Sequence, residues 1–267
     1  DGAKSIKEDG DYSDLWINIT ATNEEFVIAD NCGGIAVQTA RDYAFRFGRP
    51  KDTPQTKGSI GQFGIGMKRA LFKLGNVFEI KSVASNSSFT MKVNVGDWRD
   101  VENNWDFEFD QLEEGVQENP VEDRGTIITV TELRDDVKSL FSDNNFIKKL
   151  KTEIELEHLY NLHKGLSVQI NKTALEASQF GLKTFEGLKT AKWRKDFESG
   201  VSVEIYVGIS KDDLSEGGWY ILCNDRLVVG PETTELTGWT GKGGGGGPKY
   251  HEPVSYTHLT LPTMRTV

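Results

Sequence analysis

Gly58-Ser59-Ile60-Gly61-Gln62-Phe63-Gly64-Ile65-Gly66-Met67-Lys68 is the stretch from which the rest of the chain is interpreted. It runs into a helical pattern of apolar residues that ends at Gly75. Glycines allow positive φ and turn backbone N–H groups inward, and the first turn of a helix adds unpaired N–H donors. Lys68 and Arg69 would oppose the helix dipole unless an anion lay nearby. The stretch indicates a phosphate site, and a flexible loop with a solvated basic turn is the alternative.

Two commoner phosphate-binding loops do not fit this stretch. A P-loop needs Lys directly after its last glycine, whereas Met67 separates Gly66 from Lys68 and no Ser or Thr follows to hold Mg²⁺. A kinase loop has the reverse glycine spacing, and no His-Arg-Asp or Asp-Phe-Gly occurs downstream. Both classes are therefore set aside.

A second motif lies upstream, where the apolar run Phe26–Ala29 ends abruptly at Asp30 and is followed by Asn31, Cys32, Gly33 and Gly34. The run predicts a buried strand. A carboxylate at the end of a buried strand needs hydrogen-bond donors, and the exocyclic amine of a purine is one such donor. Taken alone, the pattern favours the alternative that Asp30 caps a helix starting near Ile35.

A third motif is Arg124-Gly125-Thr126, which opens a β-branched strand. Taken in chain order, Asp30-x-x-x-Gly34, then Gly61–Gly66, then Gly125-Thr126, the three motifs resemble the ATP-binding motifs of the GHKL superfamily, which comprises gyrase-type topoisomerases, heat-shock chaperones, histidine kinases and MutL. The resemblance implies an α+β fold, a Bergerat-type α/β sandwich in which a mixed sheet carries helices on one face. Cys32 departs from the pattern, because it stands where the family usually has its first glycine.

The resemblance also implies a ligand, ATP, and a role for each motif. The aspartate takes the adenine amine directly and through water shared with the threonine, the last glycine of the second motif lets the base approach, and the glycine loop wraps the phosphates as part of a lid. The implied ATP-binding residues are Asp30, Gly34, Gly58, Ser59, Gly61, Gln62, Phe63, Gly64, Ile65, Gly66, Lys68 and Thr126.

The segment Asp1–Ile6 resembles the segment that comes directly after a particular helix in the family. That helix carries Glu-x-x-x-Asn and supplies the general base and the Mg²⁺-binding asparagine. We therefore expect both groups upstream of residue 1, with no catalytic or metal-binding residue within the 267 residues. We expect the chain as given not to hydrolyse ATP and the intact protein to hydrolyse it.

Apolar periodicity predicts the elements of the first domain, residues 1–175. Strands are expected around Leu15–Ile19, Phe26–Ala29, Val77–Val83, Phe89–Val95, Trp105–Phe109 and Leu166–Asn171. One helix should bury Ala36, Ala40, Tyr43, Ala44 and Phe47 and end at Gly48 and Pro50, and another should span Asn144–Leu162 with Phe146, Ile147, Leu150 and Ile154 as its buried stripe. The polar segment Arg49–Ser59 is interpreted as a mobile lid. The order of these elements resembles MORC-type ATPases and their prokaryotic relatives.

A second domain, residues 176–253, is expected to be a partial S5-like transducer domain. Val201–Ile209 alternates cleanly, and Gly218–Val228 predicts a hairpin with a tight turn at Asn224-Asp225. In relatives such a domain sends a lysine to the γ-phosphate, and that lysine is not assigned. Residues 254–267 resemble a translated sequencing adapter and are interpreted as an artefactual tail, and Gly243–Gly247 is either a flexible loop or low-quality sequence.

Charge and cysteine content limit the remaining function classes. Residues 97–123 hold eleven acidic residues and one basic residue, which accounts for the net charge of −10. This acidic stretch is interpreted as a solvated insertion, and the balance elsewhere argues against a chain-wide nucleic-acid surface. No apolar run reaches membrane-spanning length. Cys32 and Cys223 give no disulfide framework, which favours a reducing cytoplasm.

Two classes of function remain open. The first is an ATPase whose ATP-dependent lid closure drives homodimerisation, with a DNA or protein client. The second is a nucleotide-binding or interaction module without turnover. A histidine kinase is disfavoured, because its catalytic domain is not normally followed by a transducer-like domain. The four histidines, His158, His163, His251 and His258, lie far from the three motifs in the sequence, and none is assigned a catalytic role.

Overall fold

The computed structural model describes residues 2–7, 10–45, 66–100, 107–177, 186–187, 189–209 and 218–234, and the backbone of 254–257. The chain divides into two units. Unit 1 comprises Asp1–Glu153 and Leu162–Glu176, and unit 2 comprises Ile154–Asn161 and Ala177–Val267. Whether these units are an ATP-binding domain and a transducer domain stays a prediction.

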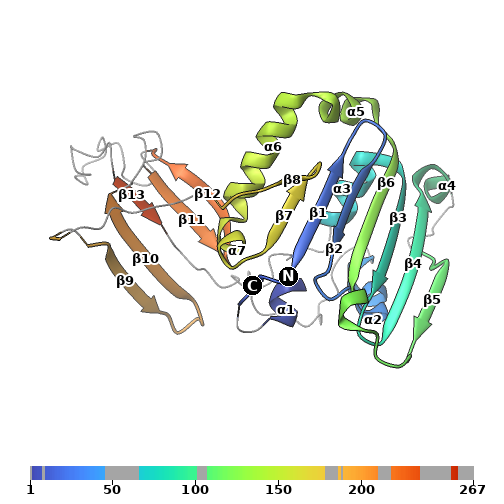
Figure 1. The fold of residues 1–267 in the computed structure, drawn as a ribbon, viewed down its shortest axis with the longest axis horizontal. Coiled ribbons are helices and arrows are strands. Elements are labelled where there is room, and N and C mark those ends of the chain that lie inside the picture. Colours follow the sequence, from blue (N-terminus) through green and yellow to red (C-terminus); the bar gives the residue numbers. More distant parts are fainter. Residues whose placement is uncertain are drawn as a thin grey trace. The chain divides into compact units, whose positions relative to one another are not determined.

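Unit 1 is built on an eight-stranded mixed sheet (Figure 1). Its strands are β1 (Trp16–Ala21), β2 (Phe26–Asp30), β3 (Gly75–Val83), β4 (Ser87–Asn94), β5 (Gln111–Glu114), β6 (Gly125–Leu133), β7 (Ser167–Ile170) and β8 (Thr173–Ala174). Their order is β5-β4-β3-β6-β2-β1-β7-β8. β1 pairs with β7 in parallel, and all the other neighbours are antiparallel. The sheet therefore brings β2 and β6, which are distant in sequence, side by side.

The helical segments follow the strands in chain order. They are α1 (Gly2–Ile6), α2 (Val37–Thr39), the π-helix η1 (Ala40–Ala44), α3 (Gly66–Leu74), α4 (Val95–Asp100), the 3₁₀ turn η2 (Val121–Asp123), α5 (Asp135–Ser142), α6 (Asn144–Glu157) and α7 (Leu159–His163). Residues from α2, η1, α3 and α5 join one apolar cluster with the inward row of the sheet. One face of the sheet is thus covered by helices, as the resemblance implied.

The core of unit 1 follows from the period of two in its strands. Phe78, Ile80 and Ser82 of β3 point inward, and Val93, Met91 and Phe89 lie opposite them on β4. The intervening residues of β3 face the other side, where Lys81 lies beside the exposed Ile127 of β6. Ser82 is the polar member of this inward row, and it lies where the motifs meet.

Unit 2 contains a five-stranded sheet in the order β12-β11-β13-β10-β9. The strands are β9 (Ala191–Asp196), β10 (Ser202–Ile209), β11 (Gly218–Cys223), β12 (Arg226–Glu232) and β13 (Val254–Thr257). Tyr220, Leu222 and Leu227 pack with Leu156 as its small core. Asn224 and Asp225 both have positive φ, 51° and 69°, which confirms the tight turn predicted between β11 and β12.

Most of the predicted elements are confirmed, and three expectations need correction. Trp105–Phe109 is wrong as a strand, because described residues 107–109 are irregular and β5 begins at Gln111. Phe107 stacks on Trp98, with ring centroids 5.6 Å apart, and Phe109 packs on Phe89, so both rings fill gaps in the core instead of alternating along a ladder. The α5 helix and β9 were not predicted.

The helix expected from Ala36 to Phe47 is also different. It begins at Val37 and changes to a π-helix at Ala40. Of the predicted stripe, Ala40 is buried and Ala36, Tyr43 and Ala44 are half-buried, whereas Val37 and Phe45, which were not predicted, are buried. The stripe predicted on α6 is only half-buried. Phe47, Gly48, Pro50, the lid Arg49–Ser59, Gly243–Gly247 and 258–267 lie outside the described residues.

Candidate functional site

Two predicted site residues meet at one edge of the unit 1 sheet. Asp30 is the last residue of β2 and Thr126 is the second residue of β6, and the two strands pair with Asp30 directly opposite Thr126. Ser82 of β3 lies opposite Thr126 on the other side. The side chains of directly opposed residues project to the same face of a sheet, so the three polar groups share the helix-covered face. We call Asp30, Ser82, Gly125 and Thr126 the motif edge.

The Asp30 carboxylate closes a turn and does not cap a helix. Its Oδ1 accepts a hydrogen bond from the Cys32 N–H at 2.7 Å, two residues on. The neighbouring Asn31 holds the same turn against β1, since its Oδ1 accepts from the Trp16 N–H at 2.7 Å. Burial raises the pKa of Asp30, and the backbone N–H groups of Cys32 and Thr126 act in the opposite direction. An ionised carboxylate has about four acceptor positions, so Asp30 can accept a further donor besides these N–H groups.

The Thr126 hydroxyl is buried and bonded to Ser82. Thr126 is 6% exposed and Ser82 is 1% exposed, and their hydroxyl oxygens lie 3.0 Å apart. Ser82 Oγ also accepts a hydrogen bond from the Ile35 N–H at 2.7 Å. Ser87 of β4 does the same for the Val37 N–H at 3.2 Å, at the start of α2, whose own N-cap residue gives no side-chain bond. Two strand serines therefore hold the segment that follows Asp30.

Two glycines of the motifs are required by backbone contacts. Gly34 has φ +70°, and a Cβ there would lie 1.9 Å from the Val83 carbonyl oxygen. A Cβ at Gly125 would lie 2.0 Å from the Asp30 carbonyl oxygen. Neither distance is compatible with any side chain, so these glycines allow the Asn31–Ile35 segment and β6 to approach their neighbours.

Cys32 replaces a glycine without strain, because the positive φ values fall on Gly33 and Gly34. The thiol is half-buried and forms no disulfide. Burial, and secondarily the Asp30 charge, raises the pKa of Cys32 to about 11. The thiol is therefore protonated at neutral pH.

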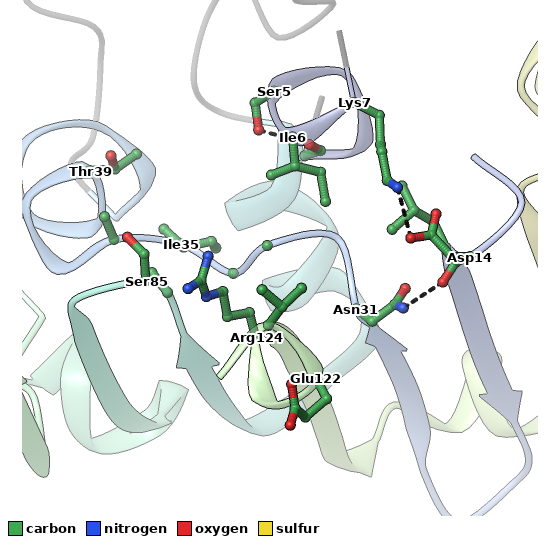
Figure 2. A pocket seen from close by; sticks show the side chains of 17 residues that line it. Ser5, Ile6, Lys7, Asp14, Asn31, Ile35, Thr39, Ser85, Glu122 and Arg124 are labelled. Atoms are coloured by element: carbon green, nitrogen blue, oxygen red, sulfur yellow. Dashed lines mark hydrogen bonds and ion pairs between the residues drawn. The ribbon is translucent and has the colours of Figure 1, made fainter. Parts of the chain in front are cut away.

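A cavity of about 1060 Å³ opens beside the motif edge. Its walls come from α1, from the segment after Asp30, from the β3–β4 turn and from the residues before Gly125 (Figure 2). Arg124 reaches towards Ile35 and Ser85 in this view, and it binds the Asn119 carbonyl at 2.7 Å and Glu118 at 2.8 Å. Lys7 pairs with Asp14 at 2.7 Å on the other wall. Each of these two walls thus carries a cation that is already paired with a carboxylate.

The predicted site residues are distributed unevenly around this cavity. Gly34 lines it, Asp30 directly precedes the lining residue Asn31, and Thr126 follows the lining residue Arg124 by two positions. Gly66 begins α3 and is exposed. The loop residues Gly58, Ser59, Gly61, Gln62, Phe63, Gly64 and Ile65 lie outside the described residues.

Lys68 has a partner that the sequence did not indicate. Its side chain is 2% exposed, and its Nζ donates to the Ala44 carbonyl oxygen at 2.9 Å. Ala44 is the last residue of η1, so the ammonium lies at the negative end of that helix. Burial lowers the pKa of Lys68. The phosphate-binding role assigned to Lys68 from the sequence stays a prediction.

The part of the chain that the structure describes holds no group of three or more His, Cys, Asp or Glu side chains suited to a metal. Within the same residues, no helix combines the length and hydropathy needed to span a bilayer.

Sequence reasoning did not predict four residues that hold or line the site, namely Ser82, Ser87, Asn31 and Arg124. Ser82 and Ser87 carried a signal, because each occupies an inward position in a strand whose other inward residues are apolar. Asn31 and Arg124 adjoin motif residues but carried no pattern of their own.

Residues 9–126 match the family described as "Histidine kinase-, DNA gyrase B-, and HSP90-like ATPase". This match supports the GHKL superfamily. It covers the second motif, the glycine loop and Gly125-Thr126, and it supports ATP binding as in a GHKL ATPase. The mixed sheet with helices on one face agrees with the Bergerat-type sandwich. No curated protein matches the chain.

Proposed function

We propose that the protein binds ATP at the motif edge and uses it as a conformational switch. The observation that carries this proposal is the pairing of Asp30 with Thr126 at the strand ends, next to a cavity lined by Gly34. Asp30 accepts a hydrogen bond from the adenine amine, and the Thr126 hydroxyl completes the contact with the base, directly or through water. Gly34 keeps the adjoining segment free of side-chain bulk.

The residues of the motif edge fit an adenine ring. A half-buried carboxylate and a buried hydroxyl are the kind of sparse polar groups that orient a ligand in a mostly apolar site. The cavity of about 1060 Å³ is slightly larger than the usual range for small-molecule sites, which ends at about 1,000 Å³. The described residues contain no cluster of His, Cys, Asp or Glu side chains that could hold the Mg²⁺ ion expected with ATP. We expect its asparagine ligand in the preceding helix, and no step is assigned to it.

The switch itself is inferred from the sequence motifs. The backbone of Gly58–Gly66 wraps the phosphates, and the stretch Arg49–Gly66 closes over the nucleotide as a lid. In the intact protein, a glutamate from the preceding helix activates water, and closure favours a homodimer and moves a transducer domain, as in MORC-type ATPases. The client is DNA or protein. We expect a reducing cytoplasm as the site of action, because two cysteines give no disulfide framework in the sequence.

A nucleotide-binding module without turnover is the second candidate. It rests on the same motif edge as the first candidate, because a carboxylate and a hydroxyl held at opposed positions of two strands suit recognition of a base whether or not the nucleotide is hydrolysed. Phosphate release from the intact reading frame distinguishes the two, since a module binds ATP and releases no phosphate above background.

The test of the ATP site exchanges one atom of the carboxylate. Asp30→Asn replaces an acceptor by a donor that faces the purine amine, so ATP affinity should fall about tenfold or more by calorimetry. Asp110→Asn is the matched control, because Asp110 also accepts a backbone N–H, that of Lys92 at 2.6 Å, but lies away from the cavity. Equal ATP affinity of the parent chain and Asp30→Asn would refute the assignment of Asp30.

A further inference from the structure

The β9 strand (Ala191–Asp196) lies at the edge of the described part of the unit 2 sheet, and all of its residues are exposed (Figure 1). Its period of two places Trp193 and Lys195 on one face. Phe197 continues this row, because its N–H donates to the Val201 carbonyl at 2.7 Å and so extends the pairing with β10. Trp193 is 48% exposed and Phe197 is 41% exposed, although such large rings are usually well buried. One face of an edge strand therefore presents an aromatic, a cation and a second aromatic.

The two faces of β9 differ in the partners of their cations. On the opposite face, Arg194 and Lys192 both pair with Glu204, at 3.1 Å and 3.5 Å. Lys195 has no carboxylate partner in the described part of the chain, and its Nζ lies 4.8 Å from the centroid of the Phe197 ring. This contact with a ring face holds the ammonium without neutralising it. Lys195 can therefore still meet an anion.

The stretch Lys189–Phe197 is basic, in contrast to the chain as a whole. It holds four basic residues and one acidic residue, whereas the chain has a net charge of −10. The side chains of Arg194 and Lys192 are more than half exposed, and an ion pair in water is weak enough for an incoming anion to compete with it. The positive charge is local, so it is compatible with a chain that has no general nucleic-acid surface.

The chemistry of this face limits the ligands that it suits. Trp193 makes no ring contact with the rest of the described residues, so its indole can take a flat partner. Single-stranded nucleic acid supplies such a partner, because its unpaired bases stack on aromatic side chains while its phosphates meet Lys and Arg. In a duplex the bases stack on one another and leave no free face for the indole. An acidic peptide would neutralise the cations but would bring no ring to Trp193.

We propose that the row Trp193, Lys195 and Phe197 is a docking surface for single-stranded nucleic acid. A base stacks on the Trp193 indole, Phe197 supports Lys195, and Lys195 meets a phosphate of the same strand. Binding is tolerant of sequence, because every base has a face that can stack. This inference rests on the client named in the proposed function, which it assigns to nucleic acid, and it does not involve the ATP site.

The test measures binding of labelled oligo-dT and oligo-U, each of about 20 nucleotides, to the full chain without ATP by fluorescence anisotropy. The parent chain should bind a single strand more tightly than a duplex of the same length, and the tighter of the two single strands identifies DNA or RNA as the ligand. Trp193→Ala should lower the affinity about tenfold. Trp193→Phe, which keeps an aromatic plane, should restore part of that loss, and Trp193→Leu should not.

Two matched controls separate this face from exposed residues elsewhere. Trp16 on β1 is 37% exposed, and its cross-strand neighbour on β7 is Ser167 instead of a cation, so Trp16→Ala should bind like the parent chain. Lys195→Ala should reduce the slope of log affinity against log salt by about 0.7, the value for one phosphate of a single strand. Lys149→Ala, at an exposed lysine of α6, should leave that slope unchanged.

Three results would overturn the proposal. They are no binding of either single strand by the parent chain at about 100 μM, equal affinities of the parent chain and Trp193→Ala, and tighter binding of poly-glutamate than of either oligonucleotide. The second would reduce the contact to attraction between charges, and the third would make the partner an acidic peptide. ATP is absent from these measurements, so they leave the ATP site untouched, whereas failure of the parent chain to bind ATP would overturn the ATP site alone.

Discussion

Two half-buried carboxylates, Asp30 at the motif edge of unit 1 and Glu204 on β10 of unit 2, have pKa values that are shifted in opposite directions. Both belong to polar networks. Asp30 is half-buried, bonded to backbone N–H groups, and burial raises its pKa. Glu204 accepts from the Tyr206 hydroxyl at 2.7 Å and pairs with Arg194 and Lys192, and the Tyr206 bond is the main reason that its pKa is lowered.

The two networks differ in the groups that their polar side chains bind. In the β9–β10 hairpin (Ala191–Ile209), the cationic partners of Glu204 are exposed, since the side chains of Arg194 and Lys192 are 56% and 53% exposed, and such pairs contribute little to stability. At the motif edge, the polar groups are withdrawn from water and hold backbone, so a change in one of them disturbs several neighbours. The larger effects of mutation are therefore expected at the motif edge.

The largest contrast is expected between two glycines with positive φ, Gly34 and Gly200. Gly34→Ala should cost about 3 kcal/mol or more of the free energy of unfolding, because its Cβ would lie 1.9 Å from a backbone oxygen of Val83. Gly200, in the β9–β10 turn at φ +80°, has open space around its Cβ, so Gly200→Ala should cost about 1 kcal/mol. Urea denaturation measures both. Similar costs at the two positions would contradict the packing of the Gly34 segment.

A smaller effect is expected at the start of α3. Lys68→Ala should cost about 2 kcal/mol of the free energy of unfolding, because it leaves a cavity and removes the donor to the Ala44 carbonyl. The neighbouring Arg69 is exposed on the same helix, so Arg69→Ala should stay within about 0.5 kcal/mol of the parent chain. Thermal or urea unfolding separates the two variants. An unaltered stability of Lys68→Ala would contradict this structural role of the lysine.

The smallest effect is a pair of opposite pH dependences. The raised pKa of Asp30 means that the folded state binds more protons than the unfolded state between the ordinary and the raised value. The free energy of unfolding therefore falls as pH rises through that window, and the cost is absent below the ordinary pKa. Asp30→Asn removes this cost, so its stability relative to the parent chain should increase with pH.

Glu204→Gln should behave in the opposite sense. The pKa of Glu204 is lowered in the folded state, so its contribution to stability is present above the unfolded pKa and is lost as pH falls through the folded pKa. The advantage of the parent chain over Glu204→Gln should shrink on acidification. Denaturant titrations between about pH 3 and about pH 7 cover both ranges. The same slope for both variants would contradict the comparison.

The sequence by itself determined the elements with a strong local signal. The alternation of β4 and β10, the strand β2 that ends in Asp30, the Gly125-Thr126 start of β6 and the Asn224-Asp225 turn all follow from residue period and turn chemistry. The motifs, with their order and spacing, were enough to indicate the superfamily that the match of residues 9–126 supports. Phe107 and Phe109 misled the strand prediction, because alternating aromatic residues also suit an irregular segment that fills a core.

The tertiary structure alone decided which groups meet. The register of β2, β6 and β3 brings Asp30, Thr126 and Ser82 together, and no local pattern specifies pairing between strands so far apart in sequence. The close approach to Val83 that requires glycine at position 34, the caps from Ser82 and Ser87, and the burial of Lys68 against Ala44 depend on backbone positions set by the whole sheet. The motifs can therefore be found from residue type and spacing, whereas the contacts that their residues make depend on how the strands pack.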